Sequence, residues 1–440
     1  MENLIGSGRK LLALAVRAGA KEAEVFGTIG RSISMDLRKS EIELGSESFF
    51  KGLGLRAVVK GAVGFSSTSD LSRLEDVAQS AVRSARARGR DDEWKALPDP
   101  AQIRMPENTF DPALDRLRPE ECIDLAMGML RGCAGIRGAE PSSGGIGCVS
   151  STEFVLNTSG VELKESGTLM HGSLETIAKG GDADVASGNE FQNSRSLISD
   201  FELVGRNAAE MAVSSLNGTK IESGTFDVIL RPIAFTELLE YTLIPSISGD
   251  SVLKGRSTLA GKIGQTIASE DLIVTDDGLL RGGMGSSAFD GEGVPSRRSS
   301  IIEQGILKAY IYDSYTAGRA GTTSTGNAVR SGFSDVPRIG IRNLIVGSEK
   351  SFDLDSDTKG LLVNGLIGAH TANPISGDFS VEARNSFYVN PDEKPRPVRS
   401  MMLAGNIFDL LKGIEIGRDV RAVGAVVTPS VRVRMKVVGS

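Results

Sequence analysis

Apolar and polar positions near the start of the chain change period twice. A stripe at helical spacing ends near Gly19 and consists of Leu11, Leu12, Leu14 and Val16. Alternating or β-branched runs broken by glycine and serine then predict an antiparallel meander over Val25-Phe26, 33–44 and 53–65. Helical spacing returns from Leu71 to Ala85. The pattern therefore predicts a helix–meander–helix unit.

The same order of elements recurs after a polar, proline-bearing segment from about residue 88 to 118, which we interpret as a connector. Pro119 suits the first turn of a second predicted helix. Strand patterns separated by turns such as 157–160 follow, and a helix is predicted from about Asp200 to Leu216. Residues 1–219 thus predict an N-terminal α+β domain of two helix–meander–helix units, a possible internal duplication.

The second half of the chain has a different pattern. A polar run around Asn217-Gly218 marks a predicted boundary, and the segment 226–230 reads as a buried strand. Short strand patterns and glycine turns dominate from there on, apart from helices predicted near 234–244 and 407–414, and the near-strict alternation at 431–438 predicts a final strand. We therefore expect residues 220–440 to form a β-dominated C-terminal domain.

Composition narrows the function classes. The chain has 440 residues, 40% hydrophobic and 24% charged, as in globular proteins of two domains. A net charge of −6 with dispersed lysine and arginine predicts no direct binding of nucleic acid. Cys122, Cys133 and Cys148 lack CxxC spacing, and no apolar run approaches the roughly 18 residues that span a bilayer. We expect a cytoplasmic protein without membrane contact.

Three ligand-binding motifs are incomplete. Gly52-x-Gly54-x-x-Ala57 precedes a predicted strand where a dinucleotide fingerprint needs a helix, so we interpret it as a turn. The segment from Gly255 to Ile263 has too long a spacer for a phosphate loop and lacks its serine or threonine. The acidic run from Asp353 carries Thr358 where a calcium loop needs glycine, which favours a solvated loop.

Metal chemistry has few possible ligands. His171 and His370 are the only histidines, and no helical His-Glu motif is present, so we predict no zinc-hydrolase site in this chain. Four acids lie near one another in sequence, namely Asp276, Asp277, Asp290 and Glu292. Carboxylates of this kind suit Mg²⁺ or Mn²⁺, although exposed loop acids are the commoner case and the interpretation that we favour.

An ordered series of short phrases resembles the TldD/PmbA family, also called the modulator-of-gyrase family. Between Phe226 and Arg330 the phrases lie at 249–251, 255–257, 276–278, 289–295 and 324–330. Two further phrases, at 373–380 and 403–410, are similar to the PmbA or TldE branch in particular. Gly52-x-Gly54-x-Arg56 extends the resemblance over nearly the whole chain.

The resemblance implies a zinc site that this sequence lacks. In the TldD branch, a His-Glu-x-x-x-His helix and a cysteine near the C-terminus hold zinc, and the glutamate activates water. Here Glu240, Tyr241 and Pro245 occupy the corresponding positions, and the tract 424–430 has no cysteine. The expectation is a degenerate site with no catalytic residue and no cofactor of its own.

The resemblance further implies a TldD-type zinc peptidase as partner, with which this chain would enclose a chamber for unfolded peptides. Two alternatives remain open. One is a homodimeric, protein-binding regulator of the gyrase-modulator type, without peptidase activity. The other keeps catalysis in this chain, with Asp290 and Glu292 acting with a non-zinc metal or with none.

Further polar residues on glycine-rich phrases are candidates for lining a substrate cavity. They are Asn327, Arg330, Asp378 and Ser380, together with Asp290 and Glu292. The alternative is that these side chains cap turns and pair with the backbone.

Overall fold

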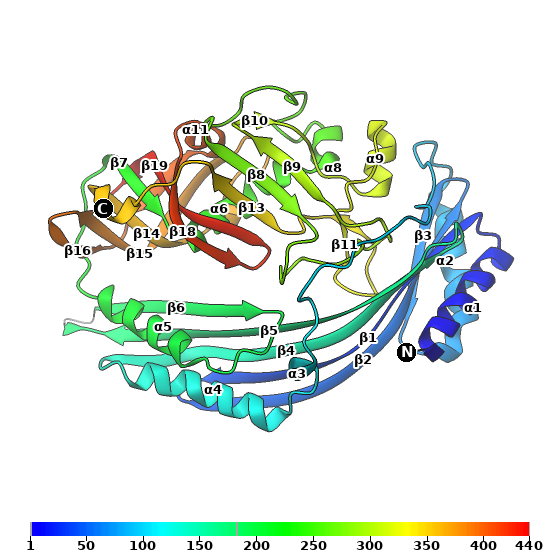
Figure 1. The fold of residues 1–440 in the computed structure, drawn as a ribbon, viewed down its shortest axis with the longest axis horizontal. Helices are drawn as coiled ribbons and strands as arrows, with labels where there is room; N and C mark the ends of the chain where they lie inside the picture. The colour runs from blue at the N-terminus through cyan, green and yellow to red at the C-terminus, as the bar shows by residue number, and fades with distance from the viewer. Residues whose placement is uncertain (1, 182–183, 440) are drawn as a thin grey trace.

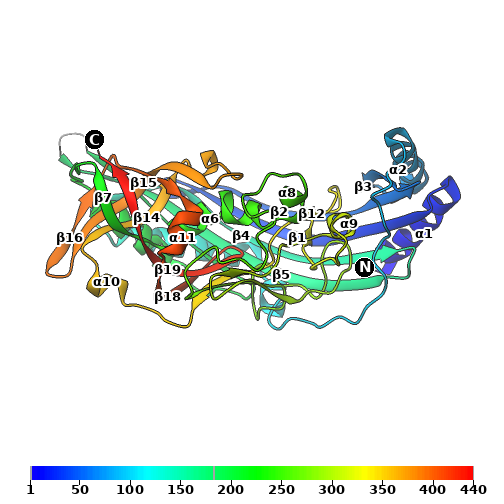
Figure 2. The ribbon, with the colours of Figure 1, turned by 90° about the horizontal axis from the view of Figure 1, so that it is seen from above.

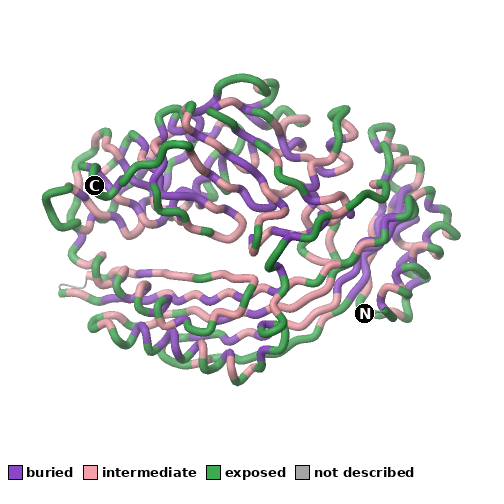
Figure 3. The backbone as a smooth tube through the Cα atoms, in the orientation of Figure 1, coloured by how far each residue is buried: buried purple, intermediate pink, exposed green. Residues whose placement is uncertain are grey.

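A computed structural model describes residues 2–181 and 184–439 and shows an α+β fold with two large sheets (Figure 1). This confirms the predicted fold class. Seen from above, the strands of the N-terminal sheet extend past the C-terminal half toward α1 and α2 (Figure 2). Buried residues are concentrated in the C-terminal sheet and beside α1 and α2 (Figure 3).

The N-terminal elements are α1 (Glu2–Ala18), β1 (Glu22–Arg38), β2 (Glu41–Val59), β3 (Ala62–Thr68), α2 (Leu74–Arg88), α3 (Pro112–Asp115), α4 (Pro119–Ala134), β4 (Ala139–Asn157), β5 (Glu162–Lys179), β6 (Val185–Ser194) and α5 (Glu202–Ser214). The later helices are α6 (Pro232–Tyr241), α7 (Leu243–Ser246), α8 (Gly249–Leu253), α9 (Ser314–Ala320), α10 (Leu354–Asp357) and α11 (Ile407–Lys412). The later strands are β7 (Gly224–Leu230), β8 (Leu272–Asp277), β9 (Arg298–Glu303), β10 (Ile306–Leu307), β11 (Ala328–Val329), β12 (Arg338–Ile339), β13 (Leu344–Ser348), β14 (Gly360–Ile367), β15 (Asp378–Asn390), β16 (Glu393–Val398), β17 (Met402–Asn406), β18 (Glu415–Val423) and β19 (Val426–Val438).

The N-terminal sheet joins the two repeated units. Its strand order is β3-β2-β1-β4-β5-β6, and every pairing is antiparallel. The first strand of each unit, β1 and β4, therefore meets its counterpart in the middle of the sheet. The two meanders that the sequence predicted form one continuous surface.

The strand ends within the first meander differ from the prediction. The turns lie at Lys39-Ser40 and Lys60-Gly61, inside the two runs predicted as strands, while residues 45–52 belong to β2. Lys60 and Gly61 both have positive φ, at 53° and 81°, as a type I′ hairpin turn requires. The glycine and serine residues at 45–48 lie within a long strand and do not form a turn.

Two pairs of helices cover the outer face of this sheet. α1 and α2 pack on the first unit through a cluster that includes Leu11, Leu53 and Val82. α4 and α5 pack on the second unit, where Met170 and Leu174 of β5 face them. The opposite face is left to the C-terminal half of the chain (Figure 1).

The predicted connector contains no strand and one short helix, α3. It is attached to the first sheet because Trp94 and Leu97 pack on Val58, and the Asn157 side chain donates to the Pro98 carbonyl. The predicted boundary near residue 219 falls between α5 and β7. We retain 1–219 and 220–440 as a proposed division of the chain.

The C-terminal sheet has 11 strands and contains a closed ring. β7 pairs in parallel with β14 and antiparallel with β19, while β15 and β17 complete the circuit. Closure leaves the ring strands without a free edge. The last strand, β19, also pairs with β13 and β18, so it holds the ring and the rest of the sheet together.

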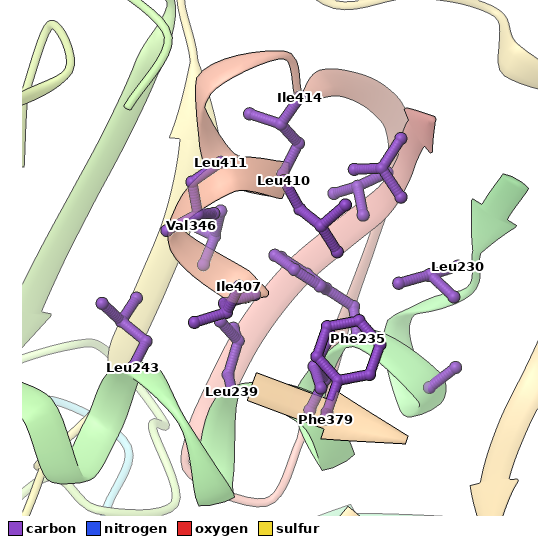
Figure 4. Packing of buried hydrophobic residues seen from close by; sticks show 14 of the residues in the cluster. Leu230, Phe235, Leu239, Leu243, Val346, Phe379, Ile407, Leu410, Leu411 and Ile414 are labelled. Carbon is purple, nitrogen blue, oxygen red and sulfur yellow. The ribbon is translucent and has the colours of Figure 1, made fainter. Parts of the chain in front are cut away.

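Helix α6 contributes to the core of the C-terminal half. It begins at Pro232, and its buried face, which includes Phe235, Leu238 and Leu239, lies against β14 and β19. Side chains of α11, such as Ile407 and Leu411, belong to the same core (Figure 4). Three short helices, α8, α9 and α10, were not predicted. Across the described residues, no helix combines the length and hydrophobicity needed to cross a membrane.

Candidate functional site

A buried chain of alternating charges joins the two halves of the molecule. Glu292 accepts from Arg56 Nη1 at 2.6 Å, and Arg56 Nη2 donates to Glu24 at 2.7 Å. Arg330 completes the chain by pairing with the other oxygen of Glu24. Glu24 and Arg56 lie on β1 and β2. Glu292 lies between β8 and β9 in the C-terminal half, and Arg330 directly follows β11. Glu24 and Glu292 are 0% exposed, so both acids lie out of reach of solvent.

Within this buried row of four charged side chains, the neighbouring charges keep Glu292 and Arg56 ionised. Burial opposes ionisation of Glu292, but Arg56 and the Ser314 N–H together hold the pKa of its carboxyl below the usual value. Burial likewise opposes the charge on Arg56, but Glu24 and Glu292 raise the pKa of its guanidinium. Each charge thus depends on its neighbours, and breaking such a buried pair is costly.

Asp290 and Asn327 hold glycine-rich segments in place. Asp290 accepts from the backbone N–H groups of Glu292, Val294 and Ala328 at 2.9–3.0 Å. Burial, followed by the Glu292 carboxylate, raises the pKa of Asp290 to about 7. Asn327 donates to Asp276 at 2.6 Å and to the Gly340 carbonyl at 2.9 Å.

These contacts correct one expectation. We favoured exposed loop acids, yet Asp276, Asp290 and Glu292 are buried and Asp277 is half-buried. The local sequence is polar and rich in glycine, and it gives no sign that the N-terminal sheet covers these loops. Four of the six cavity candidates, Asp290, Glu292, Asn327 and Arg330, lie near this contact between the halves, where their hydrogen bonds are structural.

The other two candidates lie apart from that group. Asp378 begins β15, where it accepts from Ser376 at 2.6 Å and Asn406 at 2.8 Å. The Ser376 and Asn406 hydrogen bonds lower the pKa of its carboxyl. Ser380 is exposed two residues further along the same strand. The structure therefore does not bring all six candidates together.

A cavity of about 410 Å³ lies between the N-terminal sheet and the C-terminal loops. β4 and β5 contribute Glu153 and Glu165 to its wall, and residues 284–291 and 328–330 form the facing wall. Arg195 joins the two walls by donating to the carbonyl oxygens of Thr168, Gly283, Met284 and Ser286. Arg342 also lines this cavity.

Sequence reasoning missed Glu153, Glu165, Arg195 and Arg342. Both glutamates occur in strands whose polar positions look like an ordinary solvated face. Only the pairing of β4 with β5, which sets Glu153 directly opposite Glu165, brings the two together. The arginines come from distant segments of the chain, and no short motif contains them.

The positions of the predicted degenerate zinc site lie on α6 and α7. Glu240 and Tyr241 are exposed at the end of α6, and Pro245 is half-buried in α7. The Tyr241 ring meets His370 edge-on, with 6.4 Å between ring centroids. Burial raises the pKa of Glu237, one turn before Tyr241. Among residues 2–181 and 184–439, no three His, Cys, Asp or Glu side chains are grouped so as to hold a metal.

The fold defines a class of protein: a six-stranded antiparallel sheet covered on its inner face by a ring-containing β domain. The same arrangement occurs in the crystal structure of TldE from Thermococcus kodakarensis, with a TM-score of 0.90 and 26% identity over 98% of this chain and 100% of that one.

The chain belongs to the TldD/PmbA family. Residues 23–85, 112–216 and 223–439 match PmbA/TldA metallopeptidase domain 1, the central domain and the C-terminal domain, respectively. An uncharacterized protein of Methanocaldococcus jannaschii is 32% identical over 96% of this chain and 97% of its own length. A metalloprotease PmbA homolog of Haemophilus influenzae is 27% identical over 97% of this chain and 94% of its own length.

Proposed function

We propose that this chain is the PmbA/TldE-type subunit of a cytoplasmic, heteromeric metallopeptidase that hydrolyses unfolded peptides and small proteins. A TldD-type partner supplies the zinc and the general base. This chain closes the chamber and has no catalytic residue. The observation that carries the proposal is the sequence of α6, whose Glu240 and Tyr241 stand at the positions that the family resemblance assigns to a zinc-binding histidine and the catalytic glutamate.

Two further features support a scaffolding role. The acids that could have offered an alternative catalytic pair, Asp290 and Glu292, are engaged with backbone N–H groups and Arg56. The chain is also similar in structure to a TldE over 98% of its own length.

Co-expression with a TldD-type chain tests the proposal. We expect a stable complex that contains zinc and cleaves an unfolded peptide, while the isolated chain does neither. Glu240→Gln combined with Tyr241→Phe should leave cleavage by the complex unchanged, whereas removing the histidines of the partner should abolish it. One equivalent of zinc in the isolated chain, with peptide cleavage, would contradict the proposal. Recovery of this chain only as a homodimer from native lysate would favour the regulator alternative.

A further inference from the structure

Three charged side chains in the cavity between the sheets have polar atoms without a hydrogen-bond partner. Arg342 is 8% exposed, its Nε is buried without a hydrogen bond, and no carboxylate within the described ranges lies within 4.0 Å of its guanidinium. Glu165 has one carboxylate oxygen buried without a partner. The Glu153 side chain makes no hydrogen bond to any described residue and is exposed to the cavity. Unpaired buried polar groups are uncommon because each is costly to desolvate.

Arg342 is held in place at its backbone. Its N–H donates to Asp276 at 2.8 Å, and Asp276 is itself bound to Asn327. Gly285 approaches so closely that a Cβ atom there would lie 1.9 Å from the Arg342 carbonyl oxygen. The backbone is therefore fixed while the guanidinium remains free to bind, as in a preorganised site.

The two glutamates repel each other across the sheet. Glu153 and Glu165 are direct partners in the β4–β5 register, and like charges in that position are destabilising. Glu165 is fixed by Ser287 Oγ and the Ala288 N–H, both at 2.7 Å. Loss of water around Glu153 inside the cavity is the main cause that raises the pKa of its carboxyl. Arg342 lowers this pKa, and Glu165 raises it further.

The complement of this cavity is a molecule with one cationic and one anionic end. An ammonium group near Glu153 and Glu165 would relieve the repulsion between the two carboxylates, while a carboxylate would pair with Arg342 in the planar geometry that guanidinium favours. A volume of about 410 Å³ is in the range of small-molecule pockets and exceeds the needs of a single small amino acid.

We propose that this cavity binds a short peptide with both termini free, its ammonium group at Glu153 and Glu165 and its carboxylate at Arg342. The choice of a peptide over other zwitterions rests on the proposed function, whereas the charge complementarity does not. Such peptides are products of the proposed hydrolysis, so the site would hold product.

Calorimetry on the isolated full-length chain tests this with four ligands: Ala-Ala, N-acetyl-Ala-Ala, Ala-Ala amide and free alanine. We expect acetylation and amidation each to weaken binding by at least about tenfold, because each removes a charge-assisted contact. Alanine should bind more weakly than the dipeptide. Equal binding of all four, no binding of Ala-Ala, or sensitivity to only one blocked end would overturn the proposal.

Two variants assign the ends. Glu153→Gln should weaken Ala-Ala binding and abolish the effect of acetylation while keeping that of amidation. Arg342→Gln should do the reverse, and Arg342→Lys should restore part of the affinity. Glu210→Gln and Arg104→Gln, both exposed outside the cavity, are matched controls and should bind as the unaltered chain does. Indifference of both cavity variants to the blocked ends would contradict the assignment.

The result of the peptide-binding experiment can be distinguished from the result of the experiment on the proposed function. Binding is measured without a partner and without cleavage, so loss of complex formation would leave it intact. Conversely, a chain that joins a TldD-type partner but does not distinguish Ala-Ala from its blocked forms would refute the cavity alone.

Discussion

At the residue scale, the buried charges that join the two halves contribute differently from the many exposed pairs. Glu24 lies between Arg56 and Arg330 with no access to water. Losing it would leave two guanidinium groups partly unpaired in a site of low dielectric constant. Glu24 therefore matters to stability mainly because its removal would leave buried positive charges without a counter-charge.

We predict that Glu24→Gln lowers the free energy of unfolding by about 3–5 kcal/mol. Glu162→Gln is the matched control, because the pair of Glu162 with Arg9 is exposed and screened by solvent, so its loss should change stability far less. Urea denaturation followed by circular dichroism measures both. Equal losses in the two variants would contradict a special role for the buried chain.

A second residue-scale prediction concerns the pH dependence of Glu153. Its pKa is raised in the folded state, so the ionised carboxyl opposes folding at high pH, and this penalty disappears below the ordinary carboxyl pKa of 4.5. Without ligand, Glu153→Gln should stabilise the chain by about 0.2–1 kcal/mol at pH 7–8, with no gain below about pH 4. Denaturation across this pH range measures the gain, with Glu210→Gln as reference. A gain that grew as the pH fell would have the wrong sign.

At the element scale, the order of the long helices and strands in the N-terminal half was predictable because each has a clear period. The strand ends were not. Lys39-Ser40 contains no glycine, proline or asparagine, although Lys39 adopts a φ of 55°. The glycines that looked like turn signals lie within long strands instead. Pairing such as that of β7 with β19 depends on segments from opposite ends of the C-terminal half, which no local pattern reveals.

The Lys60-Gly61 hairpin offers a test of this local geometry. Gly61 has a φ of 81°, and a Cβ atom there would lie 2.0 Å from the Asp91 carbonyl oxygen. Gly61→Ala should therefore cost well over about 1 kcal/mol, through both backbone strain and crowding. Gly255→Ala, with a φ of 64° and no atom within 4 Å, isolates the strain and should cost less in the same denaturation measurement. A similar cost at both positions would show that crowding is unimportant.

At the scale of the whole molecule, the contact between the halves explains why the candidate site was only partly predictable. Phrases at 289–295 and 324–330 drew attention to the correct loops, and Asp290 and Arg330 do line the cavity. The opposite wall belongs to β4 and β5, which carry no recognisable phrase. Sequence therefore indicated one wall of the cavity, and the fold was needed to supply the other.

The closed ring of β7, β14, β15, β17 and β19 makes the last strand indispensable to the second sheet. We predict that a chain ending at residue 425 retains a protease-resistant N-terminal part but loses protection throughout the C-terminal half. Limited proteolysis with mass spectrometry would show it. Protection of residues 224–425 in the shortened chain would contradict this.

The ring also sets an order of events during synthesis. β7 leaves the ribosome about two hundred residues before β19, its antiparallel partner, so its edge waits unpaired while the intervening chain is made. The N-terminal sheet has no such delay, because all its strands precede residue 195. During this interval a nascent chain would have a complete first sheet and an open second one. This is the period in which chaperones are most needed.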